Sequence, residues 1–147
     1  MQWHFKQLEQ LTGDELRQIY AIRKDVFCEK GEKDLGHPPM DEVDETCYHS
    51  FAWDENGIVC YCRVIEEEPK LFRIARVLVH KNYRKQGKGQ QLITHTCEKI
   101  HENFGGGVVT LSALEDIHTM YLKVGFELTG ERCEFNGIPA VEMVRLV

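Results

Sequence analysis

The feature that most constrains the fold is a strand–loop–helix–strand unit in the second half of the chain. The run LFRIARVLV at 71–79 is rich in branched residues and predicts a central strand. After a glycine-bearing loop, helical spacing relates Ile93, Thr96, Cys97, Ile100 and Phe104. Three glycines at 105–107 end that helix, and VVTLSAL at 108–114 predicts the next strand. Because a helix joins these strands, they should run parallel in one sheet with a right-handed crossover.

The elements around this unit predict antiparallel pairing. Thr12 and Glu15 form a capping box that opens a first helix, and EDIHTMYLKV predicts a short later helix. Asn56-Gly57 is a strong signal for a tight hairpin between two strands. The strand-like runs are WHFKQL, YHSFAW, IVCYCRVI, FELTGERCEF and IPAVEMVRLV. EEEP should turn the chain before the central strand. We therefore expect one α+β domain spanning residues 1–147.

Positive charge is concentrated in the centre of an acidic chain. The sequence has 18 Lys and Arg against 24 Asp and Glu, a net charge of −6. From Leu71 to Cys97 there is no acidic residue, but there are Arg73, Arg76, Lys81, Arg84, Lys85 and Lys88. This asymmetry indicates a local anion-binding element. The overall acidity argues against non-specific binding to nucleic acid.

The sequence shows no feature of a secreted or membrane protein. No segment approaches the roughly 20 apolar residues that span a bilayer, and no signal-peptide run opens the chain. We therefore expect a cytoplasmic protein without a membrane partner. Its six cysteines should be reduced and mostly buried. A zinc site using Cys47, His49, Cys60 and Cys62 is the alternative, but no C-x-x-C pair is present, so we expect no metal.

The loop between the central strand and its helix has the composition of a phosphate site. Unpaired N–H groups at a helix start attract anions, and glycines let that backbone come close to them. Arg84, Lys85 and Lys88 add charge around it. A P-loop is excluded because Lys88 is followed by Gly89, and a Rossmann fingerprint fails because Leu92 replaces its third glycine. A solvated basic turn is the alternative.

Two motifs resemble the GNAT superfamily of acyl-CoA-dependent N-acyltransferases. Arg84-x-x-Gly87-x-Gly89 after a strand resembles its pyrophosphate-binding signature. MYLKVGFELTG resembles its Y-x-x-x-G-F segment, with Tyr121, Gly125 and Phe126 in place. The segments IRKDVF, MDEVDETCYH and ARVLVHKNYRKQGKGQQL are similar to the ElaA-like and YjcF-like group of small GNAT proteins.

The resemblance implies a central mixed, mostly antiparallel sheet, flanked by helices and splayed after its fourth strand to admit acetyl-CoA. Backbone groups of the fourth strand would hold the pantetheine arm, and the N–H groups of the basic loop would hold the pyrophosphate. The implied CoA-binding residues are Val77, Leu78, Val79, Arg84, Lys85, Gln86, Gly87, Lys88, Gly89 and Gln90.

The resemblance also implies direct acetyl transfer to an amine in a ternary complex. Tyr121 would protonate the leaving thiolate, although a purely structural core tyrosine is the alternative. The N–H of Val79 would stabilise the oxyanion. Many GNAT enzymes place a glutamate on the fourth strand as base, and this chain has none there. His49 is the base that we name; the alternatives are Glu29, Asp44, Glu115, His118 or a chain of waters.

An acidic segment suggests the acceptor. Between positions 29 and 45 the acids are Glu29, Glu32, Asp34, Asp41, Glu42, Asp44 and Glu45. We expect a small cationic amine, bound by Glu29, Asp41, Asp44 and Arg76. The alternatives are that the acids solvate a loop, and that Arg63 and Arg76 form internal ion pairs with Asp41 or Asp44.

Two other functions stay open at this point. One is a CoA-binding regulatory domain without turnover, which the missing strand-four glutamate favours. The other is a nucleic-acid-binding module that uses the basic loop as a phosphate patch. The identity of the acceptor, the acyl chain length and a homodimeric state are not determined by the sequence.

Overall fold

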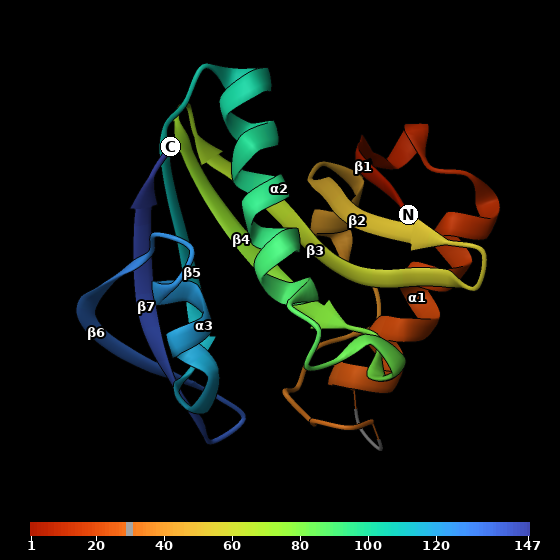
Figure 1. Cartoon of the computed structure of the whole chain (residues 1–147). Helices are drawn as coiled ribbons and strands as arrows, with labels where there is room; N and C mark the ends of the chain where they lie inside the picture. The colour runs from red at the N-terminus through yellow and green to blue at the C-terminus, as the bar shows by residue number, and fades with distance from the viewer. Residues whose placement is uncertain (29–30) are drawn as a thin grey trace.

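The computed structural model describes residues 1–28 and 31–147, and it confirms the expected α+β architecture (Figure 1). The helices are α1 (Gly13–Phe27), α2 (Lys88–Phe104) and α3 (His118–Leu122). The strands are β1 (Gln2–Gln7), β2 (Tyr48–Asp54), β3 (Gly57–Glu68), β4 (Leu71–Val79), β5 (Val108–Leu114), β6 (Glu127–Phe135) and β7 (Ile138–Leu146). Short 3₁₀ turns are η1 (Leu8–Gln10), η2 (Glu42–Glu45), η3 (Lys81–Tyr83) and η4 (Glu115–Ile117).

All seven strands form one sheet in the order β1-β2-β3-β4-β5-β7-β6. The β4–β5 pair is parallel, as the strand–loop–helix–strand unit predicted, and the other pairs are antiparallel. β4 and β5 pair only where Leu71–Arg73 meets Val108–Thr110. Both strands continue well beyond this contact, and Figure 1 shows them close at one end and apart at the other. The sheet is therefore splayed after its fourth strand, as expected.

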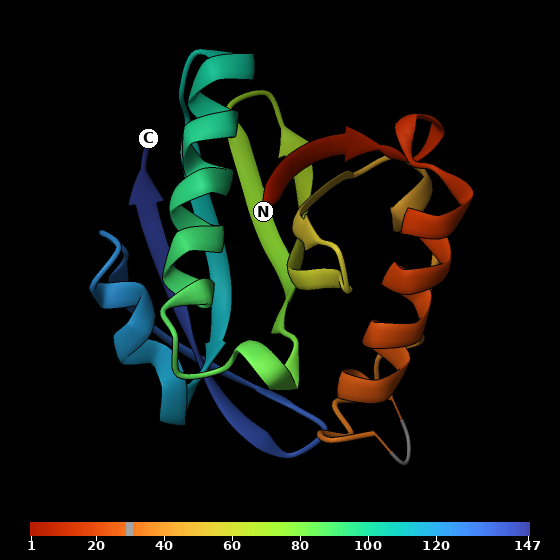
Figure 2. The ribbon, with the colours of Figure 1, turned by 45° about the vertical axis from the view of Figure 1, so that its right-hand side comes forward.

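The two long helices cover opposite faces of the sheet (Figure 2). Alternating residues of β3 define these faces, because successive side chains of a strand point to opposite sides. Cys60 and Cys62 belong to the buried cluster that contains α2 residues such as Leu92. Tyr61 belongs to the cluster that contains Ile19 of α1. Each face of the sheet therefore has its own buried core, one packed against α2 and the other against α1.

Local sequence signals fix the ends of the helices. The capping box of α1 is present, with the Glu15 N–H donating to Thr12 Oγ1 at 3.0 Å and the Thr12 N–H donating to Glu15 Oε1 at 2.9 Å. Gly105 ends α2 in a left-handed conformation at φ 77°, as predicted. The chain turns before β4 as predicted, at Pro69 and Lys70, but the glutamates of EEEP belong to β3, which continues to Glu68 opposite Leu71. No helix in the described ranges is long and apolar enough to cross a membrane.

Candidate functional site

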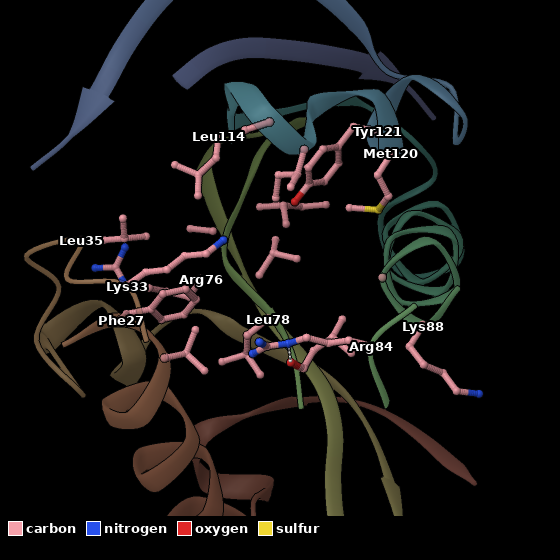
Figure 3. Close-up of a pocket in the computed structure, with 18 of the residues that line it drawn as sticks. Phe27, Lys33, Leu35, Arg76, Leu78, Arg84, Lys88, Leu114, Met120 and Tyr121 are labelled. Atoms are coloured by element: carbon pink, nitrogen blue, oxygen red, sulfur yellow. Dashed lines mark hydrogen bonds between the residues drawn. The ribbon is translucent and has the colours of Figure 1, made fainter. Parts of the chain in front are cut away.

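A cavity of about 560 Å³ lies where the sheet is splayed. Its lining comes from β4, the loop after β4, the start of α2, the end of β5, and α3. Side chains from α1, from the segment after it and from β6 close the side away from α2. Figure 3 shows Phe27, Leu35 and Arg76 on one side and Tyr121 and Met120 on the other. One cavity therefore joins the basic loop to the interior of the fold.

The basic loop presents its backbone to the cavity. Lys85 and Gly87 have positive φ of 63° and 74°, so the chain turns sharply before α2 begins. The Gln91 N–H is bonded to the Gly87 carbonyl at 3.1 Å, and the N–H groups that precede it belong to the unbonded first turn of α2. Such groups favour an anion. Arg84 ties the loop to β4, because its Nε donates to the Val79 carbonyl at 3.1 Å.

Most of the residues predicted to bind CoA line this cavity. They are Val77, Leu78, Val79, Arg84, Lys85, Gly87, Lys88, Gly89 and Gln90. Gln86 is not among the lining residues, and its side chain donates instead to the Asn82 carbonyl at 3.3 Å. The backbone N–H of Gln86 stays a candidate phosphate donor, because the prediction concerned main-chain groups.

β4 contains a bulge inside the cavity. Ala75 pairs with Arg63 and Leu78 pairs with Tyr61, so β4 has one more residue than β3 over this stretch. Arg76 takes the strained conformation at the bulge, with φ 58°. Past Arg73, the edge of β4 that faces β5 has no partner strand in the described structure. Its main-chain groups are therefore available to a ligand.

Tyr121 projects into the same cavity from α3. Its side chain is buried, and in Figure 3 its hydroxyl points toward the middle of the pocket. Phe126 packs against the Tyr121 ring in an edge-on arrangement, at a centroid distance of 6.2 Å. Burial raises the pKa of Tyr121 above its ordinary range, so the phenol retains its proton at neutral pH. The arrangement supplies a neutral O–H donor.

His49 is not brought to the cavity. It lies on β2 and is fully buried, where Nδ1 is 2.7 Å from the Tyr61 hydroxyl and Nε2 is 3.0 Å from the Asp44 carbonyl oxygen. Burial lowers the pKa of His49. Both ring nitrogens are hydrogen-bonded inside the fold. His49 therefore does not lie beside the cavity, where the expected base would have to be.

Asp41 and Asp44 also do not line the cavity, because both are engaged by arginines, Asp44 in the interior and Asp41 at a half-buried position. Asp44 is 1% exposed and accepts from Arg23 at 2.6 Å and from Arg63 at 3.1 Å. Asp41 accepts from Arg63 at 2.7 and 3.1 Å and from Arg76 at 3.5 Å. The internal ion pairs that the sequence left open are thus present. Of the four expected acceptor-binding residues, the structure brings only Arg76 to the cavity, and Glu29 lies outside the described residues.

The expected acidic acceptor end is not formed by the described residues. Glu32 is the one carboxylate among the lining residues described, and it is 2.6 Å from Arg84. Neither Glu115 nor His118, two other candidate bases, belongs to the lining. Glu115 is paired with Arg132.

Sequence reasoning missed several side chains of the cavity. They are Lys33, His37, Arg73, Ser112, Met120 and Phe135. His37 is a poor base, since burial and the charges of nearby arginines, chiefly Arg76, lower its pKa to about 4. Met120 could have been predicted to line the cavity, because it directly precedes Tyr121 in the sequence. The other residues carry no such sequence signal, because long-range packing brings them to the cavity.

One group of described residues has the spacing of a metal site, and its side chains are already engaged within the fold. Asp44, Cys47 and His49 have ligand atoms within 4.8 Å of one another, and they form the one such group found among the described residues. Two arginines already hold the Asp44 carboxylate. Burial raises the pKa of Cys47 to about 12, so the thiolate that a metal needs is unfavourable. Cys60 and Cys62 likewise have pKa values raised to about 12 by burial.

Comparison with known proteins extends over nearly the whole chain. Residues 33–147 match the family described as acetyltransferase (GNAT) domain. A UPF0039 protein of Schizosaccharomyces pombe is 33% identical over 145 residues, which cover 97% of this chain and 95% of the yeast protein. ElaA of Escherichia coli is 26% identical over 149 residues, covering 100% of this chain and 97% of ElaA.

Solved structures of similar proteins share this fold over nearly their whole length. Escherichia coli ElaA superposes with a TM-score of 0.85 over 99% of both chains. An acyl-CoA N-acyltransferase from Pseudomonas aeruginosa superposes with a TM-score of 0.85 at 25% identity over 98% of both chains. A GNAT family acetyltransferase from Elizabethkingia anophelis, solved with acetyl-CoA bound, shares the fold with a TM-score of 0.68 at 15% identity, over 99% of this chain and 97% of that chain.

Proposed function

Because the chain belongs to the GNAT acetyltransferase family, we propose that it transfers an acetyl group from acetyl-CoA to an amine in a ternary complex. The resemblance to the ElaA-like group is confirmed by the match to ElaA itself. One observation carries the proposal: a single cavity joins the basic loop, the unpaired edge of β4 and the hydroxyl of Tyr121. Pyrophosphate, pantetheine and thioester need these three environments in this order.

The loop and the strand edge fit the two halves of acetyl-CoA. The main-chain N–H groups of Lys85 to Gln90 would bind the pyrophosphate, with Lys88 adding charge. A Cβ at Gly89 would come within 3.2 Å of Met120 Sδ, so a larger residue here would crowd the wall that Gly89 and Met120 form in the cavity. The free edge of β4 at Val77–Val79 would bond the amides of the pantetheine arm, and the Val79 N–H would face the developing oxyanion.

The chemistry requires few protein groups. The neutral amine attacks the thioester carbonyl, and the tetrahedral intermediate then breaks its C–S bond to give the amide and the CoA thiolate. Tyr121 would donate a hydrogen bond to this thiolate; complete proton transfer is uphill, because burial raises the pKa of the phenol further above the ordinary thiol value of roughly 8.5. The attack leaves the amine nitrogen as an ammonium, and its proton would pass to water, since no described carboxylate free of an arginine lines the cavity.

Among the lining residues that the structure describes, no carboxylate free of an arginine can serve as a base, which also favours the alternative of a domain that binds CoA without turnover. A direct assay separates the two: release of free thiol from acetyl-CoA, measured with a panel of primary amines. We expect thiol release that depends on an amine and falls in Tyr121→Phe. Tight binding of acetyl-CoA without thiol release for any amine would favour the regulatory role. The third function, nucleic-acid binding, requires salt-dependent RNA binding and no affinity for CoA.

A further inference from the structure

The acceptor side of the cavity adjoins a buried ionic network with an excess of positive charge. Arg23, Arg63 and Arg76 share two carboxylates, those of Asp41 and Asp44. The network therefore has a net charge of +1 among the described residues. Burying an uncompensated charge is unfavourable, and the cost falls when a counter-ion is supplied.

The titratable groups around the network do not supply that counter-ion. His37 and His49 have lowered pKa values and are neutral at pH 7. Burial raises the pKa of Cys47 to about 12 and that of Tyr61 well above its ordinary range, so both keep their protons. The excess positive charge is consequently not neutralised by these groups.

Arg76 is the member of the network that reaches the cavity with unused donors. Among the described residues, its one ion pair is the long 3.5 Å contact to Asp41 Oδ2, an oxygen that Arg63 already approaches at 3.1 Å. The Nε of Arg76 is buried without a hydrogen-bond partner in the described part of the chain. The bulge holds this arginine at φ 58° on the cavity wall. A guanidinium in this state can form two parallel bonds to a carboxylate.

Apart from Glu32, which is paired with Arg84, and the neutral His37, the described residues of this wall are mostly apolar or cationic. Phe27, Leu35 and Phe135 provide apolar surface, and Lys33 adds a further positive charge. Arg73 also lines the cavity, but it is paired with Glu142 at 3.1 Å. This surface does not match a polycationic amine.

We propose that the acceptor is an amine that also carries a carboxylate, that is, an amino acid or a close analogue, and that Arg76 binds this carboxylate. The proposal rests on the proposed acetyl transfer and names the substrate class of the same cavity. The carboxylate would neutralise the buried network, while the basic loop at the other end is left to the phosphates of CoA. The acidic segment of the chain then serves to hold the arginines in place.

The test compares acceptors with and without the carboxylate, with rates referred to equal concentrations of the neutral amine, because removing the carboxylate charge also lowers the pKa of the amine. Thiol release from acetyl-CoA is measured with the proteinogenic amino acids and with their α-carboxamides. A hydrogen bond to a charged group contributes about 1.5–3 kcal/mol, so the preferred amino acid should exceed its amide by about 10- to 150-fold in kcat/KM. Equal or faster transfer to the amides would overturn the proposal and leave the acetyltransferase assignment intact.

A binding measurement keeps the two proposals distinguishable if no transfer is seen. The N-acetyl amino acids and the N-acetyl amino-acid amides are titrated calorimetrically into the protein loaded with CoA. Selective binding of the carboxylates would support the Arg76 site although the transfer proposal had failed. Absence of any such selectivity would overturn the site as well.

Substitution at Arg76 tests the residue itself. We expect Arg76→Gln to raise the KM for the amino acid at least about tenfold more than it raises the KM for its amide. Arg76→Lys should recover part of the loss, because it restores the charge without the two-pronged geometry. Arg84→Gln, at the opposite end of the cavity, is the matched variant and should raise the KM for acetyl-CoA instead. An unchanged acid-to-amide ratio in folded Arg76→Gln would contradict the assignment.

Discussion

Replacing Asp44 with asparagine tests whether this aspartate is a structural counter-ion. Asp44 Oδ1 accepts from Arg23 at 2.6 Å and from Arg63 at 3.1 Å, and Oδ2 accepts from the Asp41 N–H at 2.8 Å. The variant keeps the shape of the side chain but removes its charge. Arg23 has no exposed surface, so its cation would be left in the interior beside a neutral amide.

The expected loss follows from that burial. Breaking a buried ion pair by removing one partner costs about 3–5 kcal/mol, because the other charge is left uncompensated. For a chain of 147 residues, each kcal/mol lowers the melting temperature by roughly 2–4 °C, so Asp44→Asn should melt about 6–20 °C lower. Urea unfolding followed by tryptophan fluorescence gives the free energy of unfolding directly.

A surface ion pair provides the matched control. Asp14 and Arg17 are 3.4 Å apart with side chains 58% and 75% exposed, so Asp14→Asn should change the free energy of unfolding by less than about 1 kcal/mol. A loss below about 1 kcal/mol in Asp44→Asn would refute the counter-ion role. If Asp44→Asn has normal stability and a raised KM for the acceptor, Asp44 binds the acceptor and is not a structural counter-ion.

Three further predictions concern single residues. Gly89→Val should stay folded, since its Cβ meets the flexible end of Met120 at 3.2 Å and Val79 only at an ordinary 3.7 Å, but it should weaken acetyl-CoA binding at least about tenfold by calorimetry; unchanged affinity would contradict the loop assignment. Tyr121→Phe should lower kcat by about 10- to 1000-fold with little change in acetyl-CoA affinity, and an unaltered kcat would mean that water protonates the thiolate. Hydrogen bonds from Arg63 lower the pKa of Asp41 from 3.8 to about 2, so its contribution to stability is present above pH 3.8 and is lost as the pH falls through about 2. The difference in free energy of unfolding between wild type and Asp41→Asn should therefore shrink as the pH falls from 3.8 to about 2. A difference that stays constant over this pH range would contradict the ion pair.

The sequence predicts what short-range chemistry encodes. The parallel unit, the capping box and the glycine that ends α2 were predicted because each depends on residues close together in the chain. The basic loop and Tyr121 were recognisable for the same reason, and the structure brings both to one cavity.

The acceptor side was less predictable because it depends on long-range packing. The acids of the 29–45 segment suggested a cation site, but strand register brings Arg63 beside Asp41 and Asp44 and removes those carboxylates from the cavity. Alternation along β2 could not say whether His49 faces ligand or core, because both faces of this sheet are covered. The bulge at Arg76 could not be predicted, because no glycine marks the position with positive φ. It is seen only in the pairing of β3 with β4.

A crystal structure of the protein with acetyl-CoA tests the central claim most directly. The account predicts pyrophosphate oxygens within about 3 Å of the main-chain N–H groups of residues 85–90, and the thioester sulfur within hydrogen-bonding reach of Tyr121 Oη. The pantetheine arm should follow the free edge of β4. Acetyl-CoA bound elsewhere, or bound with its thioester remote from Tyr121, would contradict the account.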